Sequence, residues 1–297
     1  MTTRPGPSGD PADGIAILGA GLAGLSLALR LVEAGVDAPI TLLEPRTAYA
    51  CDRTWGFWET EPHPFAHLVA ERWPAWRVTT AAAQHVRAGT VPYVRLPAGR
   101  VYVDAMERLA RASNVSVRHG ARVTGVDGDR VQLADGTTLR AGVIYDGRPP
   151  APAALAAGPG PRLLQQFVGQ RVRTDRPAFT PGVADLMDFR LSQRHGIAFL
   201  YVLPSGPCEA LVEATVFAGR PVGWDALEGL LADGLARRSA AAGARVSAVV
   251  AEERGAIPMV PGLGRGRAAP CGPIPIGTRA GRRAPRPATP ICRSSAT

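Results

Sequence analysis

A glycine-rich stretch near the start of the chain has residue types and spacing that could hold a phosphate group. Residues 19–24 read GAGLAG, directly after the apolar run at 15–18 and before a helical pattern. In such a turn, Gly19 permits the tight bend, Gly21 lets the backbone approach a pyrophosphate, and Gly24 lets helix and strand pack closely. The pyrophosphate then lies at the helix N-terminus, where N–H groups and the helix dipole favour anions.

An acidic residue follows the glycines at the distance that a dinucleotide site requires. Glu44 lies 20 residues after Gly24 and follows the second predicted strand, where its carboxylate can accept a hydrogen bond from a ribose 2′-OH. An acid here repels a 2′-phosphate, which favours NAD or the AMP half of FAD over NADP at this site. The alternative is a strand–helix–strand unit that packs without binding a nucleotide.

Charge is distributed unevenly along the 297 residues, and this limits the classes of partner. The chain has 34 Lys and Arg against 25 Asp and Glu, a net charge of +9. After Glu253 there is no acidic residue, while eight arginines follow, so the part before them carries 26 basic and 25 acidic residues. A nearly neutral body argues against a nucleic-acid partner, which needs a basic face.

The cysteine and histidine patterns do not favour a metal centre. The four cysteines show no C-x-x-C spacing, and Pro64 interrupts the pair His63 and His67. We therefore predict no metal site and a reducing, cytoplasmic compartment. The apolar run at 14–29 has 16 residues and contains the glycine turn. Since a membrane-spanning helix needs about 20 residues, we predict that this run is not a span.

The hydrophobic pattern of the first half predicts a strand, a glycine turn, a helix and a strand, then a helix, a strand, two hairpins and a last strand. These segments lie at 15–18, 19–24, 25–35, 39–43, 102–112, 115–118, 126–129, 134–136 and 143–145. The last strand runs into DGR at 146–148. This order resembles the glutathione-reductase-type FAD domain, in which a late strand returns to the cofactor. Asp146 and Gly147 are then expected near the cofactor; the alternative is an ordinary turn.

The second half has a different pattern, with four strand-like runs separated by turn residues. They read LLQQFVGQRVRT at 163–174, ADLMDFRL at 184–191, GIAFLYVLP at 196–204 and EALVEATVFA at 209–218. Such runs predict an antiparallel sheet. The spacing of apolar residues predicts a helix at 224–240, and a further strand is expected at 246–250.

Together these patterns predict an α/β fold: a Rossmann-like FAD-binding domain of the glutathione-reductase type with an antiparallel-sheet substrate subdomain. The predicted division is a disordered N-terminus at 1–13, the FAD domain at 14–150, the substrate subdomain at 151–260 and a disordered tail rich in Arg, Pro and Gly at 261–297.

Residues 52–58 read DRTWGFW, in which an acid and a base precede three aromatic residues, and they begin eight residues after Glu44. With this motif the chain resembles bacterial lycopene β-cyclases, which are carotenoid-forming flavoproteins. The other segments that carry the resemblance are GAGLAG at 19–24, QQFVGQRVRTDRP at 165–177, LMDFR at 186–190, FLYVLP at 199–204, LVEAT at 211–215 and EERGAIPM at 252–259.

The resemblance implies an enzyme that closes the linear ends of lycopene into β-rings without net redox change. Such a reaction needs an acid that protonates a terminal double bond, a water-free apolar groove, and a negative or π-rich wall facing the carbocation. The resemblance also implies FAD in its reduced form, with NADPH as the reductant, and peripheral membrane contact because the substrate is lipid-soluble. Oligomeric state and the number of rings formed are left open.

Two groups of residues are candidates for this chemistry under the resemblance. Trp55, Phe57 and Trp58 could form the wall, and Asp52 and Arg53 could pair with each other or with the cofactor. The alternative is that the aromatic residues are core and that the acid and base form a structural ion pair. The cofactor contacts are expected at Gly19, Ala20, Gly21, Gly24, Glu44, Arg53, Asp146 and Gly147.

Glu213, in LVEAT, matches the functional glutamate of the family. A carboxyl group in an apolar cleft has a raised pKa and can stay protonated as an acid. The family usually has a second acid beside it, where this chain has Ala214. Asp188, in LMDFR, is a further catalytic candidate. The alternatives are an exposed strand-edge glutamate and a structural pair of Asp188 with Arg190.

The C-terminal part departs from the family, whose members generally continue for roughly another hundred residues. GPIPIGTRAG at 272–281 resembles the beginning of a flavin-contacting segment, and the resemblance ends soon after. We predict a truncated or frame-shifted member that binds FAD weakly or not at all. The remaining alternatives are another FAD-dependent enzyme of this fold, such as a hydroxylase or prenyl reductase, and an inactive remnant.

Overall fold

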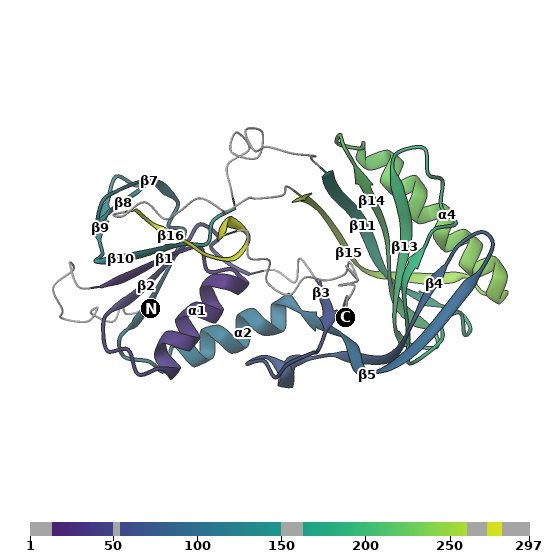
Figure 1. Cartoon of the computed structure of the whole chain (residues 1–297), viewed down its shortest axis with the longest axis horizontal. Coiled ribbons are helices and arrows are strands. Elements are labelled where there is room, and N and C mark those ends of the chain that lie inside the picture. The colour runs from purple at the N-terminus through teal and green to yellow at the C-terminus, as the bar shows by residue number, and fades with distance from the viewer. Residues whose placement is uncertain (1–13, 50–53, 150–162, 260–271, 281–297) are drawn as a thin grey trace, which may run out of the picture. The chain divides into compact units, whose positions relative to one another are not determined.

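The glycine turn at 19–24 connects a strand of a parallel sheet to the helix that follows it (Figure 1). The computed structural model describes residues 14–49, 54–149, 163–259 and 272–280. They form two compact units. Of the described residues, 14–49, 98–149 and 272–280 form the first unit, and 54–97 and 163–259 form the second.

The first unit contains a five-stranded sheet in the order β16-β10-β1-β2-β6, with parallel pairing throughout. Its strands are β1 (Ile15–Leu18), β2 (Ile40–Glu44), β6 (Val115–His119), β10 (Val143–Asp146) and β16 (Ile274–Pro275). Helices α1 (Leu22–Glu33) and α2 (Ala98–Leu109) lie side by side on one face of the sheet (Figure 1). β1 is apolar at every position because it is covered on both faces.

A small three-stranded sheet covers the other face of the parallel sheet. It consists of β7 (Val123–Asp127), β8 (Arg130–Leu133) and β9 (Thr138–Arg140), joined by the two predicted hairpins. Ala16 and Leu18 of β1 pack in one apolar cluster with Val131 and Leu133 of β8. Ile17, which alternates with them, points to the α1 side, where its side chain lies next to Gly24.

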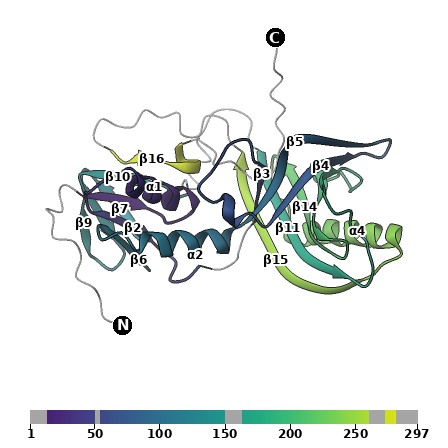
Figure 2. The ribbon, with the colours of Figure 1, turned by 90° about the horizontal axis from the view of Figure 1, so that it is seen from below.

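The second unit contains an eight-stranded sheet in the order β15-β11-β14-β13-β12-β4-β5-β3. Its strands are β3 (Thr54–Trp58), β4 (Glu71–Thr79), β5 (Gln84–Pro97), β11 (Leu163–Thr174), β12 (Val183–Asp188), β13 (Ile197–Gly206), β14 (Glu209–Ala218) and β15 (Val246–Met259). Neighbours are antiparallel except β12 and β4, which are parallel. Figure 2 shows the pronounced curvature of the long strand β15. A short 3-10 helix, η2 (Ala66–Leu68), precedes β4.

The two faces of this sheet have different chemistry because side chains alternate along each strand. On one face, Val212, Ala214 and Val216 of β14 pack against α4 (Trp224–Ala242) in an aliphatic core. On the opposite face, Leu211 and Phe217 of the same strand join an aromatic cluster. The members of this aromatic face are Trp58, Trp73, Trp76, Tyr93, Ala184, Leu186, Met187, Phe189, Phe199, Tyr201, Leu203, Leu211 and Phe217.

The α/β fold predicted from the sequence is confirmed, and three differences are informative. β4 and β5 were not predicted, because Pro74, Gly89 and Pro92 interrupt their patterns and much of β5 is exposed. The predicted boundary at residue 150 does not follow the compact units, since β3, β4 and β5 pair within the eight-stranded sheet. The predicted disorder at 261–297 is wrong for residues 272–280, which form β16 and the 3-10 helix η3 (Gly277–Ala280).

None of the helices among the described residues is long and apolar enough to cross a membrane. The predicted disordered N-terminus at 1–13 lies outside the described residues.

The close contact between α1 and β1 gives a stability prediction. A Cβ atom at Gly24 would lie 2.0 Å from the Gly19 carbonyl oxygen, so Gly24→Ala must push the helix from the strand. We expect a loss of about 2–3 kcal/mol in the free energy of unfolding, measured by urea denaturation. Gly21→Ala is the matched control, since its Cβ meets nothing within 4 Å. Equal losses for both variants would contradict this packing argument.

Candidate functional site

The turn after β1 contains a glycine with positive φ, and there is open space beside a second glycine. Gly19 has φ of +93°, a conformation that favours glycine, and its N–H donates to the Leu43 carbonyl at 2.8 Å. Gly21 precedes α1 as its N-cap residue in an extended conformation. A side chain added at Gly21 would meet no described atom within 4 Å. The turn therefore leaves room for a ligand at the N-terminus of α1, as a phosphate site requires.

Glu44 ends β2 beside this turn, and its buried carboxylate is already hydrogen-bonded. Oε2 accepts from the Ala20 N–H at 2.9 Å, and Arg46 donates to both oxygens, with Nε to Oε1 at 2.8 Å. Burial raises the pKa of Glu44, but the hydrogen bonds and charge of Arg46 and the Ala20 N–H outweigh it and hold the pKa below the usual value of a glutamate. The carboxylate is ionised, and a ribose hydroxyl would share it with Arg46.

Arg46, Tyr49 and Tyr102 form a stack over this end of the sheet that sequence reasoning missed. The tyrosine rings lie 4.3 Å apart, and the Arg46 guanidinium lies 4.6 Å from the centre of the Tyr49 ring. The Tyr49 hydroxyl donates to the Ala20 carbonyl at 2.9 Å. Only the position of Arg46 and Tyr49, shortly after the acid of the dinucleotide pattern, could have indicated this contact.

Asp146 and Gly147 also lie at the carboxyl end of the parallel sheet. The Gly147 N–H donates to the Leu18 carbonyl at 2.9 Å, so the segment after β10 returns to β1. The Asp146 carboxylate is buried between two arginines, with Arg148 Nη2 at 2.8 Å and Arg279 Nε at 3.1 Å. Asp146 therefore fixes the two chain segments that follow β10 and β16.

Residues 272–280 contact the glycine turn directly. β16 pairs with β10 in parallel, and the Ile276 N–H donates to the Asp146 carbonyl at 2.9 Å. A Cβ atom at Gly277 would lie 2.8 Å from Cβ of Ala23, in the first turn of α1. Figure 2 shows η3 beside α1. This segment therefore closes one side of the turn that the sequence identifies as a phosphate site.

The side chains of the motif at 52–58 that the structure describes point to both sides of β3. Asp52 and Arg53 lie outside the described residues. Trp58 packs against the aromatic face, with its ring centre 5.3 Å from that of Tyr93. Gly56 is on the same side, where its hydrogen leaves space for the Tyr93 hydroxyl. Trp55 and Phe57 alternate with these residues and point to the other side of the strand.

Glu213 lies on the aromatic face of the eight-stranded sheet. It stands opposite Tyr201 of β13, and the Thr215 hydroxyl donates to its Oε1 at 2.6 Å. Burial, then the negative charge of Glu253, raises the pKa of Glu213 to about 8, against the smaller lowering effect of the Thr215 hydrogen bond. A carboxyl group with this pKa is mostly protonated at neutral pH and can act as an acid.

Glu253 is a second acid near Glu213 that sequence reasoning did not identify. In the sheet, Gly169 of β11 is the register partner of both Glu213 on β14 and Glu253 on β15. A Cβ atom at Gly169 would lie 3.3 Å from Cγ of Glu253 and 3.4 Å from Cγ of Glu213. The two carboxyl groups thus flank a glycine on one face. Only the register of three strands, which the sequence does not reveal, brings them together.

The surroundings of Glu213 on this face are aromatic. The Tyr93 and Tyr201 hydroxyls are 2.8 Å apart, although their strands are separated by β12 and β4 in the sheet order. Curling of the sheet brings them together. Phe199 and Phe217 stack with centroids 5.9 Å apart, on the strands that carry Tyr201 and Glu213. Rings of this kind stabilise positive charge at their faces.

Asp188 is not part of this group, because it lines a pocket between the sheet and α4. Arg190 Nη2 lies 2.6 Å from its Oδ2. Burial alone would raise the pKa of Asp188, but the Arg190 hydrogen bonds and charge hold it below the usual value. The structural reading, a pair of Asp188 with Arg190, is the one that the geometry supports. Among the described residues there is no group of three His, Cys, Asp or Glu suited to a metal ion.

Comparisons with solved structures show the fold. The chain is 12% identical to a geranylgeranyl bacteriochlorophyll reductase-like protein from Thermoplasma acidophilum, with a TM-score of 0.60 over 82% of this chain and 66% of the other. A second likeness is to a probable FAD-dependent monooxygenase from Pseudomonas aeruginosa, with 14% identity and a TM-score of 0.50 over 69% of this chain and 60% of the other. The fold is thus the predicted Rossmann-like one with an added sheet unit.

Sequence comparisons show the family. A lycopene β-cyclase of Paracoccus sp. is 32% identical over 279 residues, which are 90% of this chain and 67% of that protein. A lycopene β-cyclase of Pseudescherichia vulneris is 30% identical over 69% of this chain and 52% of its own length. The chain thus spans between half and two thirds of these relatives. The model of the family described as "Lycopene cyclase protein" matches residues 14–291, and the chain belongs to this family.

Proposed function

We propose that this chain is a lycopene β-cyclase, which forms β-rings at the ends of linear lycopene. The observation that carries the proposal is a half-buried carboxyl group, Glu213, with a pKa raised to about 8 on an aromatic sheet face. Protonating an alkene needs an acid that is still protonated at working pH, and the cation formed needs a surface that stabilises it without attacking it. This face supplies both.

The proposed reaction begins with a proton transfer from Glu213 to the terminal double bond of lycopene, which leaves a tertiary carbocation. The neighbouring double bond attacks this cation, a carbon–carbon bond closes the ring, and the positive charge moves to a ring carbon. Loss of a proton from the adjacent carbon forms the ring double bond. One proton enters and one leaves, so the product is an isomer of the substrate.

The aromatic side chains have the role of a wall around the cation. Tyr201 and Phe199 lie on β13, which pairs with the strand that carries Glu213. Trp58 packs against Tyr93, a member of the same aromatic cluster. Their ring faces stabilise positive charge by up to about 2 kcal/mol each when water is excluded. Trp58 is the residue of the 52–58 motif that fits this role, whereas Trp55 and Phe57 point away.

Glu253 takes the role of the second acid that is absent at Ala214. Its negative charge helps to keep the proton on Glu213, since two neighbouring carboxylates repel each other. Once Glu213 has given up its proton, the ionised pair lies on the side of the sheet where the cation forms. Either carboxylate can then accept the proton that the ring carbon loses.

FAD is the proposed cofactor, and the described residues fit its ADP half. Gly21 leaves open space at the N-terminus of α1, and the ionised Glu44 can accept from a ribose hydroxyl if Arg46 gives up one of its hydrogen bonds. Reduced flavin would supply electron density to the reaction, with NADPH as the proposed reductant. Asp146, Gly147 and the segment at 272–280 border the same turn. Peripheral membrane contact is proposed because the substrate is lipid-soluble, and a cytoplasmic location because the cysteine pattern fits a reducing compartment.

The acid role of Glu213 is tested by substitution. Glu213→Gln keeps the shape and the Thr215 contact but removes the ionisable proton, and we expect cyclisation to fall by a factor of about 100 or more. The assay supplies lycopene in lipid vesicles with reduced FAD and measures cyclic products by chromatography. Glu228→Gln, on the exposed side of α4, is the control. Wild-type activity in Glu213→Gln would contradict the role.

A cyclisation product from the wild type would exclude the alternatives of an inactive remnant and of another FAD enzyme of this fold. Consumption of O₂ with a hydroxylated product, or reduction of a prenyl chain, would instead identify a hydroxylase or a reductase.

The pair of acids predicts a pH dependence. Activity requires protonated Glu213, whose pKa is about 8, so the rate should fall as the pH rises through that value. Glu253→Gln removes the neighbouring negative charge and therefore lowers the pKa of Glu213. We expect the alkaline limb of the pH–rate profile to move to lower pH. An unchanged limb, measured over the same buffers, would show that Glu253 does not act on Glu213.

The glycine turn predicts how FAD affinity responds to substitution. Gly21→Ala should weaken FAD binding by about tenfold or more, because its methyl group occupies the space where a pyrophosphate approaches the backbone. Binding is measured by titration of flavin fluorescence up to millimolar FAD, a range that also reveals the weak binding predicted from the sequence. Gly229→Ala, in the exposed part of α4, is the control. Equal affinity in wild type and Gly21→Ala would argue against the turn as the site.

A further inference from the structure

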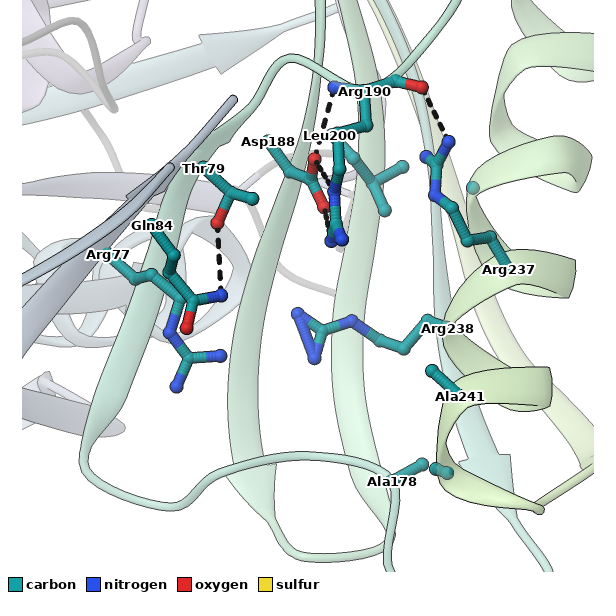
Figure 3. A pocket seen from close by; sticks show the side chains of 12 residues that line it. Arg77, Thr79, Gln84, Ala178, Asp188, Arg190, Leu200, Arg237, Arg238 and Ala241 are labelled. Carbon is teal, nitrogen blue, oxygen red and sulfur yellow. Dashed lines mark hydrogen bonds and ion pairs between the residues drawn. The ribbon is translucent and has the colours of Figure 1, made fainter. Parts of the chain in front are cut away.

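The pocket lined by Asp188 lies on the opposite face of the eight-stranded sheet from Glu213. It has a volume of about 210 Å³ and is lined by residues of β4, β5, β13, α4 and the segment around the end of β12. Figure 3 shows that the side chains of Arg77, Arg190 and Arg238 extend toward one another from three different elements. Arg237 lines the same pocket, above Arg238 on α4.

The pocket has an excess of positive charge. Asp188 pairs with Arg190 at 2.6 Å, and Asp185 lies between Arg238 and Arg77, whose Nε is 3.3 Å from its Oδ1. Arg237 donates to the Arg190 carbonyl at 2.5 Å, and its charge acts on Asp188, which is already paired with Arg190. Four guanidinium groups thus face two carboxylates, and two positive charges are not balanced within the pocket.

This crowding is unfavourable for the protein without an anion. Arg237 Nη2 is buried without a hydrogen-bond partner among the described residues. Arg77 Nε is also buried, and its contact with Asp185 Oδ1 at 3.3 Å is an ion pair without hydrogen-bond geometry. Burial, followed by the charge of Arg190, lowers the pKa of Arg77. Burial and then the charge of Arg77 lower the pKa of Arg238 to about 10. Buried donors without hydrogen bonds and like charges close together both destabilise a folded chain, and a bound anion would relieve both.

We propose that this pocket binds the phosphate group of a small ligand. Guanidinium groups match the oxygens of phosphate and donate in pairs, and donors from three directions suit a tetrahedral anion better than a planar carboxylate. The volume is below the roughly 300–1,000 Å³ of sites for drug-sized ligands, so the pocket takes a phosphate-sized group and not a whole nucleotide. The ligand is either a free phosphate or the phosphate of a lipid headgroup.

The test is binding of inorganic phosphate to the whole chain, measured by calorimetry at constant ionic strength adjusted with sodium chloride. We expect Arg77→Gln and Arg237→Gln each to weaken binding about tenfold, the loss of one or two charge-assisted hydrogen bonds. These variants leave Asp185 paired with Arg238 and Asp188 paired with Arg190, which protects the fold. Arg245→Gln, whose side chain is 90% exposed, is the control and should bind phosphate as the wild type does.

Two results would overturn the proposal: no binding of phosphate to the wild type, or equal binding by wild type and both pocket variants. The second result would assign the phosphate to another site, such as the turn at 19–24. Circular dichroism of each variant confirms that a loss of binding is not a loss of fold.

The two sources of phosphate are separated with vesicles. Phosphatidylglycerol vesicles that sediment the wild type, but less of both pocket variants, would identify a lipid headgroup. Calorimetric binding without this difference in sedimentation would identify a free phosphate. Phosphatidylcholine vesicles control for contact that does not depend on net charge.

Discussion

The placement of Glu213 depends on the cost of burying a carboxyl group on an apolar surface. Alternation along β14 puts Val212, Ala214 and Val216 into the aliphatic core under α4, so Glu213 must point to the other face. There it meets aromatic rings, one hydroxyl donor and the charge of Glu253. A protonated carboxyl group avoids most of the cost of a buried charge. The burial of side chains that stabilises the sheet thus also keeps Glu213 protonated.

Glu44 of the first unit is held in the opposite ionisation state. Glu44 and Asp146 are buried at the ends of β2 and β10, the strands on either side of β1, and each is held by arginine side chains. For Glu44 the arginine outweighs burial, so its carboxylate stays ionised where Glu213 stays protonated. A hydrogen-bond acceptor for ribose needs the ionised form, and a proton donor needs the neutral form. A buried acid paired with arginine is ionised, as Glu44 is, whereas a buried acid among aromatic rings keeps its proton, as Glu213 does.

The sequence predicted much of this arrangement where chemistry is local. The turn at 19–24, the acid at Glu44 and the hairpins between β7 and β9 follow from short patterns, and the structure has each of them. The strands β4 and β5 escaped detection because their proline and glycine residues interrupt the alternation. The sequence could not predict that Glu253 and Glu213 lie on either side of Gly169, because this depends on the register between strands that are distant in the sequence. Asp188 was ambiguous in the sequence for the same reason.

The central claim is that Glu213 is a protonated acid at neutral pH, and infrared difference spectroscopy tests it most directly. The carbonyl stretch of a protonated carboxyl group is followed across a pH titration in wild type and in Glu213→Gln. The account predicts a carboxyl band that is lost with a midpoint near pH 8 in the wild type and is absent from the variant. A wild-type spectrum in which every carboxyl group has ionised below pH 6 would contradict it.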